Sequence, residues 1–153
     1  MADHGGFSIK ECGLVISPKV TFLAASPDGL VSCECCGAGV LEVKCPFKCR
    51  TLTVPEYLAC RDSCFCINET GDIDVKHSHQ YYYQMQAQMF VCDVQYCDFV
   101  VCTFPAEQAE IFVKRVYRDT EFLEKCLKSA NHFFRSCVLP ELMGRAYSRP
   151  LTV

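Results

Sequence analysis

The sequence predicts one α/β domain in which a mixed sheet is flanked by helices. Three observations support this class. Short apolar segments separated by turn residues occupy the first 45 positions. Two further strand-like segments lie between two segments with helical periodicity. The 153 residues suit a single domain, and half of them are hydrophobic, which is enough for one core.

The first half of the chain is expected to supply three strands. Residues 13–34 divide into two short strands, because turn residues stand at positions 17–19 and 27–29. Residues 39–45 alternate in a strand pattern, and this third strand stops at Pro46, which cannot donate to a ladder.

A short helix and a hairpin should follow. Thr53 is placed to cap a helix that has Pro55 in its first turn. The segments 64–67 and 72–76 flank a turn that ends at Gly71, as in a small hairpin.

The second half predicts a helix, two strands and a long amphipathic helix. The helix runs over about residues 78–92, and strands follow at 96–104 and 107–119, the second at the edge of the sheet. The final helix covers residues 119–143, with Thr120 as its cap and Pro140 allowing at most one more turn.

The bulk composition limits the partners of the chain. A formal net charge of −3 excludes a protein that holds nucleic acid by charge alone, but not a nuclease that gathers acidic residues around metal ions. No apolar run has the length of a membrane span, and the first residues lack the features of a secretory signal. We therefore expect an intracellular protein without a membrane partner, nuclear if the source is eukaryotic.

Fourteen cysteines leave three interpretations open. Disulfides need an oxidising compartment. Zinc is disfavoured because the C-x-x-C of residues 33–36 has no second such pair, although a looser group at residues 60–66 has His77 and His79 nearby. The remaining interpretation is that most are small buried hydrophobes, as the apolar context suggests for several: Cys92, Cys97, Cys102, Cys126 and Cys137.

The third strand carries two charges that an apolar strand does not need. Val40, Glu42 and Lys44 share one face because strand side chains alternate. A buried unpaired carboxylate is costly, and a hard cation such as Mg²⁺ or Mn²⁺ explains it better. Asp28, in the turn before, would supply a second carboxylate, and the backbone carbonyl of Val43 a further oxygen.

Lys44 would then lie beside the water that the metal activates and would stabilise charge on the phosphate. The competing interpretation is a surface hairpin whose Glu42 and Lys44 face solvent. From these two residues alone, that plainer interpretation is the stronger one.

The helix at residues 78–92 carries a polar stripe. Gln80, Gln84 and Gln88 are four residues apart, with Tyr81 next to them. Such amides would hydrogen-bond a phosphate or a metal-bound water, or else face solvent. The core face of this helix is formed by Tyr82, Met85 and Met89, and Gln86 is left out of the predicted core.

Taken together, the segments SPDGLV, GVLEVKCPF, HQYYYQMQAQMFV and CDFVVCTF resemble the YqaJ viral-recombinase family. That family groups with lambda-type exonuclease in the PD-(D/E)-x-K nuclease superfamily. The resemblance covers about residues 11–143 and implies a restriction-endonuclease-like core. It places a nuclease domain at residues 1–143 and a tail at residues 144–153.

The resemblance also implies roles for individual residues. Asp28 and Glu42 correspond to the metal-binding carboxylates, and Lys44 to the catalytic lysine. Tyr81 and Gln84 match the Y-x-x-Q helix over the active site. The implied activity is a Mg²⁺-dependent deoxyribonuclease of 5′-to-3′ exonuclease ancestry, acting on DNA and able to form oligomers.

Basic residues would hold the DNA backbone. Lys48 and Arg50 are preferred because they directly follow the catalytic strand, whereas Lys114, Arg115 and Arg118 fit a solvated surface.

The sequence departs from the family pattern before Asp28. The 27 residues there read as loop and strand, where the family has a helical segment with another metal-binding Glu and the groups that receive a 5′ phosphate. The alternative function is therefore an inactive transposon- or virus-derived remnant that binds DNA or protein.

Overall fold

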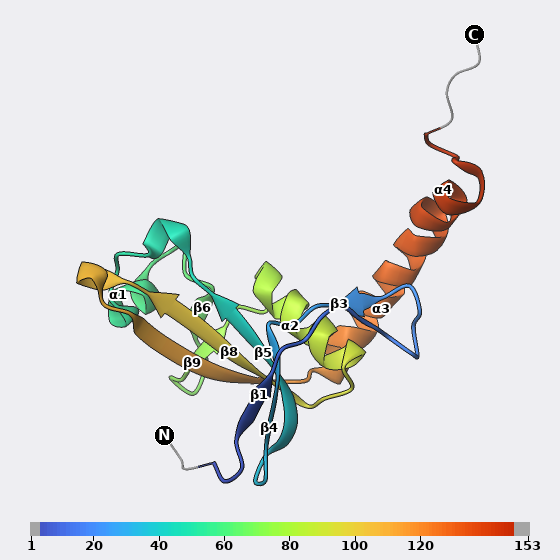
Figure 1. Cartoon of the computed structure of the whole chain (residues 1–153). Helices are drawn as coiled ribbons and strands as arrows, with labels where there is room; N and C mark the ends of the chain where they lie inside the picture. Colours follow the sequence, from blue (N-terminus) through green and yellow to red (C-terminus); the bar gives the residue numbers. More distant parts are fainter. Residues whose placement is uncertain (1–3, 149–153) are drawn as a thin grey trace. The chain divides into compact units, whose positions relative to one another are not determined.

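The computed structural model describes residues 4–148, apart from the side chain of Glu107, and its centre is a five-stranded mixed sheet (Figure 1). The strand order is β1-β4-β5-β8-β9. The strands are β1 (Ser8–Lys10), β4 (Gly29–Cys33), β5 (Gly37–Lys44), β8 (Tyr96–Thr103) and β9 (Glu110–Tyr117). The α/β class with a mixed sheet is confirmed, and β9 lies at an edge as predicted.

The direction of the strands follows from their connections. β4 and β5 are joined by a short turn and pair antiparallel, with Gly29 opposite Leu41. β5 and β8 pair parallel, with Glu42 opposite Phe99, because a long crossover separates them. β8 and β9 again pair antiparallel.

Three further strands were less visible in the sequence. β1 was missed because its three residues carry no readable alternation. Residues 13–28 contain β2 (Val15–Ile16) and β3 (Ala24–Ala25), which form a separate two-stranded sheet. Asp28 follows β3 and precedes β4, as the predicted turn required.

The crossover between β5 and β8 contains the predicted short helix and hairpin. A 3-10 turn (Phe47–Cys49) leads to α1 (Val54–Ala59), where Thr53 and Glu56 form a reciprocal capping box. The hairpin β6 (Phe65–Ile67) and β7 (Ile73–Val75) follows. Phe65 lies 5.2 Å from Phe112 and 5.7 Å from Phe99, ring centre to ring centre, so aromatic contacts join the hairpin to the sheet.

Helix α2 (Gln80–Val91) contacts β5 and β8 and covers one face of the sheet. Met85 and Met89 have no exposed surface and Tyr82 very little, so the predicted core face is confirmed. The exclusion of Gln86 from the core is wrong. Its side chain is fully buried, and its Nε2 donates to the Tyr117 carbonyl at 2.9 Å, which satisfies the buried amide. Helical periodicity does not reveal this tertiary contact.

Gly39 allows a close contact inside this sheet. A β-carbon at this position would lie 2.3 Å from the Tyr96 ring, well inside van der Waals contact. The Tyr96 hydroxyl donates to the Gly37 carbonyl at 3.1 Å, which fixes the ring across β5. A glycine is therefore needed where the ring crosses the strand.

Residues 119–148 belong to a second compact unit. Helix α3 (Thr120–Phe133) passes through a π-helical segment (Phe134–Val138) into α4 (Leu139–Gly144). The predicted cap at Thr120 is wrong, because the side chain of Asp119 accepts from Phe122 N at 3.0 Å. Pro140 lies in the first turn of α4, where its missing N–H is tolerated, so the helix continues to Gly144.

All fourteen cysteines are free thiols. Of the five expected to be buried, Cys97 has no exposed surface, whereas Cys92, Cys102, Cys126 and Cys137 are half-buried. No helix in the described residues is both long and apolar enough to cross a bilayer. The proposed domain boundary at residue 143 stays a prediction, and part of the predicted tail, residues 149–153, lies outside the described residues.

Candidate functional site

Glu42 is the centre of a polar network beneath α2. Its side chain is 1% exposed, so the interpretation as a solvent-facing surface residue does not hold. Gln84 Nε2 donates to Glu42 Oε1 at 2.7 Å, and Gln88 Nε2 donates to Oε2 at 2.6 Å. The helix thus presents two amide donors to a buried carboxylate, and both bonds have the short length of charge-assisted hydrogen bonds.

Lys44 completes this network from the same strand. Its ammonium forms an ion pair with Glu42 Oε1 and lies 5.1 Å from the centre of the Tyr81 ring. The lysine side chain is 24% exposed, so one side of the ammonium remains open to solvent. A cation held between a buried carboxylate and an aromatic face, yet partly accessible, is well placed to meet an anionic ligand.

Asp28 immediately precedes β4 and is bound to the part of β5 that carries Glu42. Gly29 pairs with Leu41, Asp28 N donates to the Leu41 carbonyl at 3.0 Å, and Asp28 Oδ2 accepts from Val43 N at 2.7 Å, so Asp28 is bound to the residues on either side of Glu42. The Asp28 side chain is exposed, whereas that of Glu42 is buried.

Val43 lies between Glu42 and Lys44 along the chain. Its N–H donates to Asp28 Oδ2 at 2.7 Å, so its polar backbone groups face the β4 side of β5. The N–H and C=O of one strand residue point toward the same neighbour. The carbonyl of Val43 is therefore directed to the edge where Asp28 lies.

Asp28, Glu42 and the Val43 carbonyl offer oxygen atoms, the type of donor that hard divalent cations prefer. The set consists of two carboxylates and one carbonyl, and oxygen ligands of this kind suit Mg²⁺ and Mn²⁺. A carboxylate has about four lone-pair positions, and Glu42 uses three of them on Gln84, Gln88 and Lys44. One position on Oε2 remains for an ion.

The glutamine stripe divides into two parts. Gln80 is exposed, as the solvent-facing interpretation expected, while Gln84 and Gln88 both reach Glu42. Gln88 was not among the predicted site residues, although its spacing of four from Gln84 was the available signal. Its Oε1 is buried without a hydrogen-bond partner in the described residues, an unusual feature for a native core.

His79 is a second residue that sequence reasoning missed. It is the N-cap of α2, and its Nδ1 accepts from Tyr81 N at 3.2 Å. The His79 and Tyr81 ring centres lie 4.6 Å apart, so the cap also positions the aromatic ring under Lys44. Burial lowers the pKa of His79, and the charge of Lys76 lowers it further, which keeps the cap neutral.

The basic residues near the site differ in how much of their charge is already paired. Lys48 and Arg50 are exposed, and Arg50 lies over the Phe47 ring at 4.2 Å. The second group is paired with aspartates: Lys114 with Asp74, Arg115 with Asp98, and Arg118 with Asp93. The preference for Lys48 and Arg50 as backbone contacts is consistent with this difference.

The opposite face of the sheet carries a hollow of about 730 Å³. It is lined by alternate residues of the strands, among them Leu41, Val100 and Val113, so it lies away from Glu42. None of the predicted catalytic residues lines it.

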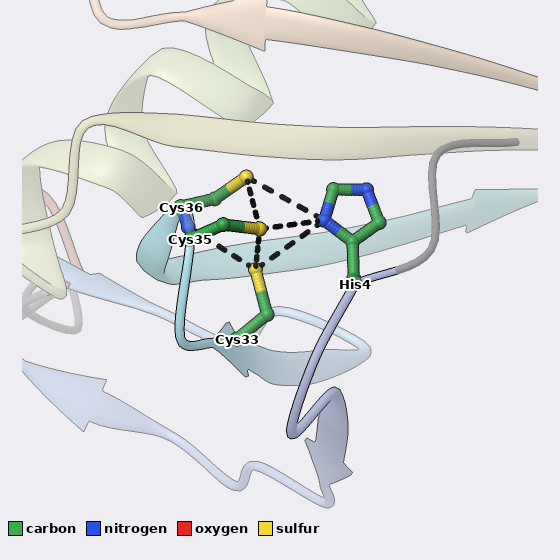
Figure 2. A group of neighbouring side chains, drawn as sticks. All are labelled: His4, Cys33, Cys35 and Cys36. Carbon is green, nitrogen blue, oxygen red and sulfur yellow. Dashed lines mark hydrogen bonds between the residues drawn. The ribbon is translucent and has the colours of Figure 1, made fainter.

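A separate group of thiols lies at the other end of β5. The sulfurs of Cys33, Cys35 and Cys36 lie together on one side of the His4 ring (Figure 2). Hydrogen bonds with the neighbouring thiols raise the pKa of Cys35 to about 11, and a hydrogen bond with Arg115 lowers that of Cys36. The looser cysteine group near His77 and His79 does not form such a cluster within residues 4–148.

A mixed sheet, a covering helix and a buried Glu beside a Lys define an α/β domain with a polar site at its strand ends. The model of the YqaJ-like viral recombinase domain matches residues 5–95, more than half of the chain. The chain therefore belongs to the YqaJ-like viral recombinase domain family.

Individual relatives agree with this family. "Uncharacterized protein R354" of Acanthamoeba polyphaga mimivirus is 32% identical over 115 residues, which cover 69% of this chain and 18% of that protein. The crystal structure of an alkaline exonuclease (LHK-Exo) from Laribacter hongkongensis is similar, with a TM-score of 0.57 and 27% identity over 85% of this chain and 57% of the exonuclease.

The same exonuclease in complex with dAMP gives a TM-score of 0.58, again at 27% identity, over 85% of this chain and 56% of that one. The fold is thus that of alkaline exonucleases. The chain spans slightly more than half the length of these structures and about a fifth of the viral protein.

Proposed function

We propose that this chain is a metal-dependent DNA nuclease of 5′-to-3′ exonuclease ancestry that hydrolyses phosphodiester bonds. The observation that supports it most strongly is that Asp28 binds the backbone of β5 on both sides of Glu42, at Leu41 and Val43, while Lys44 lies against the buried Glu42 carboxylate. The alkaline exonuclease neighbours and the dAMP bound to one of them favour DNA as the substrate.

Asp28, Glu42 and the Val43 carbonyl would hold Mg²⁺ or Mn²⁺. Such an ion supplies an activated water at neutral pH and a positive charge for the phosphate oxygens. Gln84 and Gln88 fix the orientation of Glu42 through their two amide bonds. The carboxylate is thereby preorganised before any ion arrives.

Lys44 would orient the water and stabilise negative charge on the phosphate. Its ammonium already lies at the carboxylate and is partly open to solvent, so a small side-chain shift would bring it to an incoming phosphate. Tyr81 supports that position through its ring. Lys48 and Arg50 would hold the DNA backbone just beyond the catalytic strand.

The test is cleavage of end-labelled linear duplex DNA with Mg²⁺ or Mn²⁺. Asp28→Asn, Glu42→Gln and Lys44→Ala should each lower the rate by at least about 100-fold, as removal of one electrostatic stabiliser does in other enzymes. The matched controls are Glu121→Gln and Lys125→Ala, which alter an exposed ion pair of 2.7 Å on α3. Full activity of Lys44→Ala would refute the catalytic role.

One observation favours the second candidate, a binding module without catalysis. Lys44 already supplies a positive charge to Glu42, so the carboxylate is compensated without a metal ion. Calorimetry with Mn²⁺ separates the two functions. Binding that is lost in Asp28→Asn and Glu42→Gln supports the nuclease, whereas DNA binding without Mn²⁺ binding supports the module.

DNA contact by the loop after β5 has its own test. Lys48→Ala and Arg50→Ala should each reduce the salt dependence of duplex binding by the amount that corresponds to about one phosphate contact. The loss of affinity should be the same for all DNA sequences. Lys114→Ala is the control, because Asp74 already pairs with this lysine at 3.8 Å.

A further inference from the structure

Four side chains that ligate soft metals converge at the tip of the β4–β5 hairpin. The Nδ1 of His4 and the Sγ atoms of Cys33, Cys35 and Cys36 all lie within 4.8 Å of one another. Figure 2 shows the three sulfurs on one side, with the His4 ring facing them from a segment some thirty residues earlier in the chain. The C-x-x-C of residues 33–36 has no second such pair in the sequence, and in the structure His4 supplies the fourth donor.

The backbone brings these side chains together. Cys33 ends β4, and Gly37, with a φ of +73°, begins β5, so Glu34, Cys35 and Cys36 form a three-residue hairpin loop. The Glu34 N–H donates to the Gly5 carbonyl at 3.0 Å, which holds the segment next to His4 against this loop. The Cys36 N–H donates to Cys33 Sγ at 3.3 Å, a bond that stabilises a thiolate.

We propose that His4, Cys33, Cys35 and Cys36 bind one Zn²⁺ as a closed, structural Cys₃His site. Four protein donors leave no open position, which is the pattern of structural zinc rather than catalytic zinc. The zinc ion would hold residues 4–7 against the tip of the β4–β5 hairpin. Asp28 and Glu42 lie near the opposite end of the same hairpin. This proposal is independent of the nuclease proposal.

The distances agree with tetrahedral coordination. Zn–S bonds of about 2.3 Å and Zn–N bonds of about 2.0 Å at tetrahedral angles place sulfurs about 3.8 Å apart and nitrogen about 3.5 Å from sulfur. The Cys35 sulfur lies 3.5 Å from that of Cys33 and 3.6 Å from that of Cys36. The His4 nitrogen lies 3.6 Å, 3.0 Å and 3.7 Å from Cys33, Cys35 and Cys36.

The local charge also suits such a centre. Three thiolates and one Zn²⁺ leave a net charge of about −1, and Arg115 hydrogen-bonds with Cys36 while its other donors bind Asp98. A disulfide would use two of the three thiols and leave the third and His4 without a role.

The site is distinct from the proposed catalytic centre. Gly37 and Glu42 are five residues apart on β5, so the two centres lie about 17 Å apart along the strand. Their ligands also select different metals, since thiolates favour zinc and carboxylates favour magnesium. Loading one site therefore need not load the other.

The experiment measures zinc in the full chain, purified under reducing conditions without chelators. Elemental analysis should find about one zinc ion per chain. Replacement of that ion by Co²⁺ should produce the visible d–d bands of a tetrahedral site and a thiolate-to-cobalt charge-transfer band. Cys35→Ser and His4→Ala should each lower zinc affinity by at least about tenfold, since even residues outside the ligand set have effects of that size.

The controls are Cys66→Ser and His132→Ala, which remove an exposed cysteine and an exposed histidine elsewhere in the chain. Both should keep the zinc content and the cobalt spectrum. His4 precedes the first strand, so its loss tests the site without disturbing the core. Circular dichroism of each variant verifies that the fold is kept.

Three results would overturn the proposal. One is a zinc content far below one per chain together with no cobalt bands after Co²⁺ addition. Another is unchanged zinc affinity in both Cys35→Ser and His4→Ala, which would place the ion elsewhere. The third is a disulfide among Cys33, Cys35 and Cys36 in freshly isolated protein, detected by mass spectrometry.

Discussion

Replacing Lys44 with methionine tests whether the buried Glu42 depends on an ion pair. Methionine keeps most of the volume of the lysine stem and removes the ammonium that contacts Glu42 Oε1. Gln84 and Gln88 still donate to the carboxylate, but they carry no charge. The folded state would then contain a buried charge without a counter-ion.

The expected size follows from the exposure of the two side chains. Removing one partner of a fully buried ion pair lowers the free energy of unfolding by about 3–5 kcal/mol. Glu42 is 1% exposed, but Lys44 is 24% exposed and partly hydrated. We therefore expect Lys44→Met to lower the free energy of unfolding by about 2–3 kcal/mol in the absence of divalent ions.

A double-mutant cycle isolates the pair. Urea unfolding is followed by circular dichroism, because the chain has no tryptophan. In a Glu42→Gln background the carboxylate charge is gone, so Lys44→Met should lower the free energy of unfolding by less than about 1 kcal/mol. An equal effect of Lys44→Met in both backgrounds would show that the lysine stabilises the fold without its charge, and the reasoning would fail.

Three more substitutions test other elements. In the folded state the pKa of His79 lies below its ordinary value of 6.5, so the free energy of unfolding should fall as the pH falls below 6.5. His79→Asn should make that decrease smaller in urea titrations at different pH values. An unchanged pH dependence in this variant would contradict the prediction. Gly39→Ala should lower the free energy of unfolding by about 1–3 kcal/mol, because its β-carbon meets the Tyr96 ring, and an unperturbed melting temperature would refute that contact. Thr53→Ala should lower the same quantity by about 1 kcal/mol while Thr53→Ser keeps it, and equal losses in both would argue against the hydroxyl cap.

Local sequence patterns were sufficient to predict most strands of the central sheet and helix α2. The alternation in residues 39–45 identified β5, and Thr53 with Pro55 marked the start of α1, because these signals act within a few residues. β1 is stabilised by pairing with β4 rather than by its own three residues, so its sequence carries no signal. Asp119 and Thr120 are neighbours, and the side chain of either residue is able to cap a helix. The sequence alone therefore does not fix which of the two is the cap.

The candidate site was visible where its residues lie close together in the sequence. Glu42 and Lys44 stood out because charges are unexpected in an apolar strand. Gln88 was seen only as part of a stripe, since its partner is 46 positions away. His4 was missed for the same reason, because the hairpin loop it meets lies far along the chain.

The most direct test of the central claim is the position of Mn²⁺ in a crystal of this protein. Anomalous scattering at a wavelength sensitive to manganese should reveal one ion between the carboxylates of Asp28 and Glu42, within coordination distance of both. Mn²⁺ bound only elsewhere, with Lys44 still paired to Glu42, would contradict the claim that these carboxylates form a metal centre.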